Sequence, residues 1–193
     1  SVAAIVIGTV VGAVVGIQLV YGNWLTRLPF RIYVDVMRGT PVLVLILAAF
    51  YIPAIAGLSL SATEAGILAL SLFAGAHIGE LLRGALQAIP PGQAEAGRSI
   101  GLTFPQLLRY VLLPQAIRAA LPPWINTGVE LIKGSSLLSM IGVGELLLKT
   151  QEVIGRNFMT MQFYVFAGLL YLIVNIVLER VGKTVERRLG ASL

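Results

Sequence analysis

The chain has 193 residues, of which 57% are hydrophobic and only 12% are charged. A soluble domain carries about 25% charged residues, so this composition excludes water as the main solvent and indicates an integral membrane protein. The formal charge of +5 therefore bears on membrane orientation rather than on nucleic acid, which we do not expect as a partner. Because cysteine is absent, disulfides and thiolate metal sites are excluded as well.

About five helices are predicted to span the membrane, since a bilayer core requires about 20 mostly apolar residues per helix. The predicted spans lie at residues 2–20, 42–55, 62–82, within 111–132, and at 158–178. The chain opens with Ser1 and is apolar at once, so we expect that the native N-terminal part of the first helix is missing. No repeat or linker divides the sequence, and residues 1–193 are interpreted as one transmembrane domain.

Glycine recurs every four residues in the first span, at Gly8, Gly12 and Gly16. A helix face without side chains allows another helix to approach closely. This spacing predicts tight packing between the first span and a neighbouring helix.

The distribution of basic residues predicts the orientation, because cytoplasmic segments are rich in Lys and Arg. Segment 21–38 carries three arginines and is interpreted as a polar cytoplasmic connection, whereas turn 57–61 has no basic residue and is placed outside. The last span ends in a basic tail, which places the C-terminus in the cytoplasm; its charged residues are Glu179, Arg180, Lys183, Arg187 and Arg188. Segment 134–157 then lies outside, with residues 137–148 too short to span.

Residues 93–114 form a polar interruption that reads as two short helices lying along the membrane face. Gly101 is expected to end the first helix with a positive φ, Thr103 to cap the second, and Pro105 to stand in its first turn. Glu95 and Arg98, three residues apart, are able to pair locally. From these residues alone, the segment is either a docking surface or an amphipathic loop on lipid headgroups.

The spacing of Glu95-Ala96-Gly97, Gly101 and Val111-Leu112-Leu113-Pro114 resembles the EAA signature of ATP-binding-cassette (ABC) importer permeases. Gly97 stands in place of an alanine and Val111 in place of an isoleucine. Further segments resemble the polar amino-acid uptake branch of that family: Arg38-Gly39-Thr40-Pro41, Glu80-Leu81-Leu82-Arg83-Gly84, Ile89-Pro90-Pro91-Gly92-Gln93, Leu113-Pro114-Gln115-Ala116 and Ile132-Lys133-Gly134-Ser135-Ser136-Leu137.

The resemblance implies the type I ABC importer fold, an all-α membrane protein with a cytoplasmic coupling loop at residues 93–114. It implies alternating access driven by a dimer of separate ATPase subunits, a second permease copy or paralogue, and an extracytoplasmic amino-acid-binding protein. The implied location is the bacterial cytoplasmic (inner) membrane, in contact with lipid. The residues that the resemblance assigns to ATPase coupling are Glu95, Ala96, Gly97, Arg98, Gly101, Leu102 and Pro105.

The chain itself is not expected to be an enzyme, because no nucleophile, base and orienting group gather in one segment. Gly182-Lys183-Thr184 is similar to the end of a phosphate-binding loop, but Val177 stands where that loop requires glycine. ATP and Mg²⁺ are therefore expected on the partner ATPase. A lone histidine, His77, predicts no metal site. The alternative from another functional class is an ion-coupled carrier or channel that works without an ATPase.

The fourth span contains Pro122-Pro123, which predicts a kink or break of the kind that borders substrate sites in transporters. Beyond it, Asn126, Glu130 and Lys133 share one helical face. These charges either line a substrate pathway or form an internal Glu130–Lys133 pair at a helix end. The predicted pathway residues are Asn126, Glu130, Lys133, Ser135 and Ser136. Relatives of the family commonly have Asn-Glu where this chain has Asn126-Thr127, so its substrate contacts are expected to differ.

Overall fold

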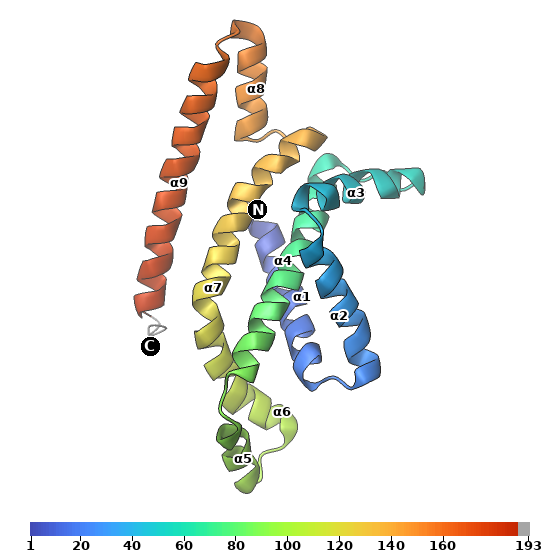
Figure 1. Ribbon diagram of the computed structural model, residues 1–193, viewed down its shortest axis with the longest axis vertical. Helices are drawn as coiled ribbons and strands as arrows, with labels where there is room; N and C mark the ends of the chain where they lie inside the picture. The colour runs from blue at the N-terminus through green and yellow to red at the C-terminus, as the bar shows by residue number, and fades with distance from the viewer. Residues whose placement is uncertain (189–193) are drawn as a thin grey trace.

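The computed structural model describes the backbone of residues 1–188 and the side chains of residues 1–185. The side chains of Arg187 and Arg188, which the sequence assigns to the basic tail, lie outside this part. Within the described part, all regular secondary structure is helical. Figure 1 shows the long helices running along the long axis of the molecule, with short helices at its two ends. The predicted all-helical fold is confirmed.

The helices are, in chain order, α1 Val2–Tyr21, α2 Trp24–Gly39, α3 Val42–Ile55, α4 Ala62–Gln87, α5 Pro91–Ser99, α6 Phe104–Leu107, α7 Leu113–Gly134, α8 Leu146–Asn157 and α9 Thr160–Arg188. A π-helical turn, Leu108–Leu112, joins α6 to α7, and a 3₁₀ segment, Ser135–Ile141, follows α7. In the described residues, α1, α4 and α9 are each long and apolar enough to span a membrane, and two bent helix pairs bring the candidate spans to five.

The closest helix contact joins α1 to α4 along the glycines of α1, as their spacing predicts. Gly8, Gly12 and Gly16 are all buried. A Cβ atom added at these glycines would lie 2.4 to 2.8 Å from Cβ atoms of α4. The α4 residues in question are Ala74, Ile78 and Leu82.

The contact is reciprocal, because α4 contributes glycines of its own. Gly75 lies against Val11 and Gly79 against Val15, with added Cβ atoms meeting the valine Cγ1 atoms at 2.7 and 2.6 Å. Each helix therefore places branched side chains over the bare backbone of the other. In a bilayer, where apolar burial between helices gives little driving force, such close van der Waals packing drives association.

Segment 21–38, predicted as a polar connection, is instead largely the helix α2, and that prediction is wrong. Asn23 caps this helix by accepting the Thr26 N–H at 2.9 Å. Pro29 lies inside it. One face packs on α1 and α4 through Phe30, Tyr33, Val34 and Met37. A second face exposes apolar side chains, namely Leu25, Leu28, Ile32 and Val36.

The second membrane crossing therefore differs from the one predicted at residues 42–55. Helix α3 has only 14 residues and meets α2 at an angle of 111°. At about 1.5 Å per residue, α3 is about 21 Å long, too short to cross a bilayer core. In Figure 1, α2 runs beside α4 while α3 points away across the axis. Helix α2, with 16 residues or about 24 Å, is also too short, so the candidate second crossing is the bent pair of α2 and α3 together.

A charge cluster joins α2 to α4 around Glu80. Its carboxylate accepts two hydrogen bonds from Arg83, at 2.7 and 2.8 Å. Arg31 and Arg38 reach the same carboxylate from α2, with N–O distances of 3.9 and 3.7 Å. The Glu80 side chain is only 18% exposed. Seven residues, or about 10 Å, separate Glu80 from the end of α4, so the cluster lies within the span.

Helix α7 is continuous through Pro122 and Pro123, so of the predicted kink or break the break does not occur. Each proline removes one backbone hydrogen bond. Such losses are tolerated in membrane helices because neighbouring helices and hydroxyl side chains satisfy the freed backbone groups. One turn later, the Thr127 hydroxyl donates to the Pro123 carbonyl oxygen at 3.0 Å. This bond does not replace those lost at the prolines, which concern the carbonyls four residues before them.

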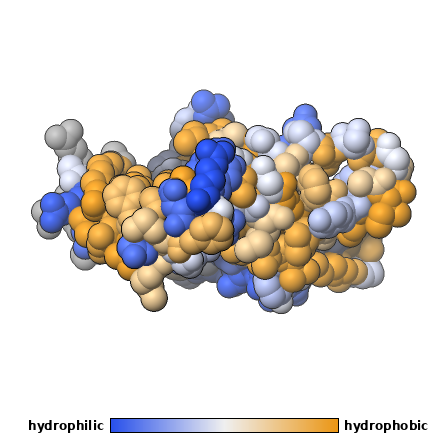
Figure 2. All heavy atoms as spheres, turned by 90° about the horizontal axis from the view of Figure 1, so that it is seen from above, coloured by the Kyte–Doolittle hydropathy of each residue, from blue (hydrophilic) through white to orange (hydrophobic). Residues whose placement is uncertain are grey.

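Helix α9 stands apart from the bundle and packs mainly on α7 and α8. Its span is exposed along nearly its whole length, whereas α4 is the most buried of the candidate spans. Tyr171 of α9 donates a hydrogen bond to Glu145, the N-cap of α8, at 2.8 Å. Figure 2, which views the molecule along its long axis, shows hydrophobic residues over much of the visible surface.

Replacing Gly12 by leucine is expected to separate α1 from α4, because the new side chain meets Ile78 and the backbone of Gly79. Overpacking of this kind costs about 1–3 kcal/mol. The measurement is the melting temperature of the purified protein in detergent. Gly84→Ala is the matched control, since a Cβ there meets no atom within 4 Å. Equal melting temperatures for both variants would show that the glycine contact does not stabilise the fold.

Replacing Glu80 by glutamine is expected to destabilise the protein by about 3 kcal/mol, because three guanidinium groups lose their shared carboxylate within the span. Denaturation of the detergent-solubilised protein measures this change. Asp35→Asn serves as the comparison, because among the described residues Asp35 pairs only with Arg31 and its side chain is 58% exposed. That variant should lose less than about 1 kcal/mol. A Glu80 variant as stable as the Asp35 variant would refute the anchoring role.

Candidate functional site

The loop between α4 and α7 begins with α5, which ends as the sequence predicts. Gly101 has a φ of +83°. Its N–H bonds to the carbonyl of Arg98 at 3.0 Å, and the N–H of Leu102 bonds to the carbonyl of Gly97 at 3.1 Å. These two bonds form a Schellman motif, in which a left-handed glycine closes the helix and satisfies its last carbonyls. The predicted turn residue is therefore confirmed.

The second half of the loop begins with a second short helix, α6, capped at Thr103. Gln106 accepts from both the Thr103 backbone N–H and the Thr103 hydroxyl, at 2.9 Å each. Pro105 stands in the first turn of α6, as predicted. Helix α6 then passes through the π turn into α7 without a break. The expected pair of short helices is thus present, and the second one continues into the membrane helix α7.

The loop is attached to the ends of three membrane helices. Leu107 and Leu112 are buried in a cluster with Leu82 and Leu86 of α4. Phe104 packs edge-on against Tyr21 at the end of α1, with ring centroids 5.0 Å apart. These contacts seat the loop on the cytoplasmic ends of α1, α4 and α7 predicted by the charge distribution.

The small residues of the EAA segment have different environments. Gly97 is buried, and a Cβ added to it would lie 2.5 Å from a terminal methyl group of Leu107. Ala96 is exposed, as are Glu95 and Arg98. Glu95 and Arg98 form no ion pair with each other in the described structure, so both charges remain available to a partner.

Large hydrophobic side chains also face outward from the loop. They are not among the site residues that the sequence predicts. Ile100 is 77% exposed, Tyr110 is 64% exposed and Phe104 is 47% exposed. Leu102 is half-buried, whereas Pro105 is exposed. The surface therefore combines charges with apolar groups, as protein-docking surfaces do. The only sequence signal for Ile100 and Phe104 is that they are apolar residues next to Gly101 and Thr103.

Helix α7 has an exposed polar face, as its residue spacing predicts. Asn126, Glu130 and Lys133 are exposed, whereas Thr127 and Leu131 are buried. The alternative of an internal Glu130–Lys133 pair is not observed, because no ion pair joins them in the part of the chain described here. Glu130 lies four residues, or about 6 Å, before the end of α7.

The two serines predicted in the same pathway lie beyond the end of α7, in the 3₁₀ segment. Both are half-buried. The Ser135 hydroxyl donates to the carbonyl of Ile132 at 2.7 Å, and the carbonyl of Ser136 accepts from Ser139 at 2.7 Å. The structure therefore uses the Ser135 hydroxyl and the Ser136 carbonyl in local turns.

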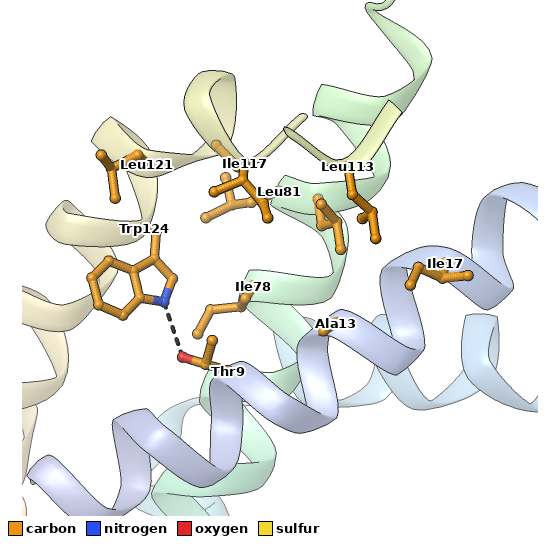
Figure 3. A pocket seen from close by; sticks show the side chains of 11 residues that line it. Thr9, Ala13, Ile17, Ile78, Leu81, Leu113, Ile117, Leu121 and Trp124 are labelled. Atoms are coloured by element: carbon orange, nitrogen blue, oxygen red, sulfur yellow. Dashed lines mark hydrogen bonds between the residues drawn. The ribbon is translucent and has the colours of Figure 1, made fainter. Parts of the chain in front are cut away.

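An apolar cavity of about 370 Å³ lies between α1, α4 and α7 (Figure 3). Thr9 and Trp124 are the polar side chains of its wall, and the Trp124 indole N–H donates to the Thr9 hydroxyl at 3.0 Å. The other lining residues are Ala13, Ile17, Ile78, Leu81, Leu82, Leu113, Ile117, Ala120 and Leu121. Burying a charged amino acid here would leave its two charges without partners, so this cavity is unsuited to such a substrate.

A second cavity, of about 390 Å³, lies between α7 and the C-terminal half of α9. Its wall is mixed in polarity and includes Asn126 of the polar face. Glu179 and Lys183 line it from α9. From the sequence, Glu179 and Lys183 are predicted only as part of the basic tail, because their proximity to α7 depends on how α7 and α9 pack.

The sequence and fold match those of known transport proteins. Residues 5–191 match the family model described as "Binding-protein-dependent transport system inner membrane component". The chain is 40% identical to the L-cystine transport system permease protein TcyB of Bacillus subtilis, covering 84% of this chain and 70% of that protein. It is 34% identical to the glutamine transport system permease protein GlnP of Escherichia coli, covering 94% and 84% respectively.

A solved structure of similar fold is described as the crystal structure of an amino acid ABC transporter with histidines. The match has a TM-score of 0.89 and 30% sequence identity, and it covers 96% of this chain and 87% of that one. The family match spans nearly the whole chain, and the fold agrees with it. The chain therefore belongs to the family of inner membrane components of binding-protein-dependent transport systems.

Proposed function

We propose that the chain is the permease subunit of an ATP-driven ABC importer for polar amino acids. The observation that carries the proposal is the exposed loop of α5 and α6, whose second half continues directly into α7. The relatives named above, one for L-cystine and one for glutamine, support amino acids as the cargo. An ion-coupled carrier would have no use for a docking surface of this kind.

The partners follow from this assignment. A dimer of ATPase subunits binds ATP and Mg²⁺ and docks on the loop through Glu95, Ala96, Arg98 and the exposed side chains beside them. A second permease copy or a paralogue completes the pathway. An extracytoplasmic amino-acid-binding protein delivers the substrate at the opposite end, which carries α3 and α8. The complex lies in the bacterial inner membrane with the C-terminus of this chain in the cytoplasm.

The mechanism is alternating access in which the loop acts as a lever. Closure of the ATPase dimer displaces α5 and α6. Because α6 and α7 are joined by a π-helical turn rather than a flexible link, the displacement passes directly into α7. That helix carries Asn126, Glu130 and Lys133 on its exposed face. ATP binding is thereby coupled to movement of the face that we assign to the substrate pathway.

Replacing Gly101 by valine tests this coupling, because a β-branched residue is strained at a φ of +83°. A left-handed conformation costs an ordinary residue about 1–2 kcal/mol, so the end of α5 should shift. In proteoliposomes with ATPase and binding protein, we expect substrate-stimulated ATP hydrolysis and uptake to fall at least tenfold.

The control is Gly92→Ala in the same helix, where an added Cβ meets no atom within 4 Å. That variant should transport like the unmodified protein. The unmodified permease reconstituted without its ATPase should show no uptake. Normal stimulated hydrolysis and uptake by the Gly101 variant would contradict the lever, and uptake without ATPase would contradict the proposed function itself.

Replacing Glu130 by glutamine tests the pathway role of the polar face. Loss of a carboxylate removes a charge partner for a cationic side chain, so uptake of L-arginine should fall about tenfold more than uptake of L-glutamine. Glu152→Gln is the control, since Glu152 is exposed on α8 and pairs with Lys149. Equal loss of both substrates in the Glu130 variant would assign Glu130 a purely structural role.

A further inference from the structure

We propose that the cavity between α7 and α9 binds the charged backbone groups of the transported amino acid. Glu179 would contact the α-ammonium group and Lys183 the α-carboxylate, with Asn126 on the opposite wall. The cavity is lined by Pro122, Ile125, Asn126, Val129, Glu179 and Lys183. This inference rests on the proposed function, since it names a site for the cargo of the importer.

The two charges on α9 are placed to pair with each other but do not. Glu179 precedes Lys183 by four residues, which is the favoured order for an ion pair on a helix. No ion pair joins these two side chains in the described structure. Instead the Glu179 carboxylate accepts a hydrogen bond from the Asn175 amide at 3.0 Å, and both charged side chains line the cavity.

The position of Glu179 and Lys183 leaves both charges open to a charged ligand. Both lie near the C-terminal end of the candidate span Thr160–Val185, and both side chains are exposed. A zwitterion supplies one charge of each sign, and so it complements Glu179 and Lys183 together. A simple cation or anion would satisfy only one of them.

The walls of the cavity are held in place by a close helix contact. Gly182 is buried, and a Cβ added there would lie 2.6 Å from a methyl group of Ile125 on α7. This contact fixes α9 against α7 between the two charged positions. The volume of about 390 Å³ falls within the range of about 300–1,000 Å³ typical of small-molecule sites.

The polarity of the wall distinguishes this cavity from the apolar one beside α1. Here a carboxylate, an ammonium and an amide side chain converge with Pro122, Ile125 and Val129. A small number of polar groups on an apolar wall is the usual composition of a site that orients a polar ligand. The apolar cavity offers only a tryptophan and a threonine already bonded to each other.

The test compares an amino acid with analogues that lack one charge. The permease–ATPase complex in lipid nanodiscs is titrated by saturation-transfer NMR with whichever of L-glutamine, L-arginine and L-cystine it transports best. The α-amide and the des-amino acid of that compound are titrated in parallel. The unmodified complex should prefer the amino acid over either analogue by about tenfold or more, as expected for charge-assisted hydrogen bonds.

Each variant should lose one preference only. Lys183→Gln should bind the amino acid about tenfold more weakly and the α-amide unchanged, whereas Glu179→Gln should lose the preference over the des-amino acid. Arg180→Gln is the matched control, because Arg180 is exposed on the same helix and does not line the cavity. It should retain both preferences.

If both cavity variants keep the preference for the amino acid over its two analogues, the inference is overturned. ATP-driven uptake by the unmodified complex would in that case still support the proposed function. Loss of bound phosphatidylethanolamine from the variants, with amino-acid binding unaltered, would assign the cavity to a lipid headgroup and also overturn the inference. Absence of ATP-driven uptake by the unmodified complex would overturn both.

Discussion

The contact between α1 and α4 is the interaction on which the rest of the structure depends. Glycines on both helices let their backbones approach so closely that each added Cβ would collide with the other helix. With α4 held centrally, α2, α3 and α7 all pack against it. Glu80 then comes within reach of the arginines of α2, and Leu82 and Leu86 form the seat of the loop. The packing of the second crossing and the position of the loop therefore both depend on the contact between α1 and α4.

The features of the fold that the sequence predicts are those set by neighbouring residues. The left-handed turn at Gly101 and the cap at Thr103 need only a few residues on either side, and both occur. The glycine face of α1 is likewise visible from its spacing. From the sequence, residues 21–38 are interpreted as a connection because their arginines and Pro29 dominate the local composition. The apolar spacing of Phe30, Tyr33, Val34 and Met37, which is that of a buried helix face, was the available signal.

The features of the fold that the sequence does not predict depend on contacts between distant residues. Arg31 and Arg38 of α2 pack against α4 because Glu80, more than 40 residues away, neutralises them in part. Glu179 and Lys183 look like an ordinary basic tail until α9 is placed against α7. Nothing in the local pattern around Gly182 specifies that it meets Ile125. Such pairings arise from the packing of whole helices, which one sequence does not reveal.

The continuity of α6 with α7 links the two parts of the candidate site mechanically. One end of this helical segment carries the docking surface, and its middle forms a wall of the cavity shared with α9. Helix α9 is a separate helix, and beside this cavity its Gly182 packs on Ile125 of α7. A displacement that enters at the loop therefore reaches the α7 wall of the cavity first and reaches Glu179 and Lys183 across this helix contact. In the proposed mechanism, the helical connection from the loop to Asn126 is what makes the contacts in the cavity depend on the state of the ATPase.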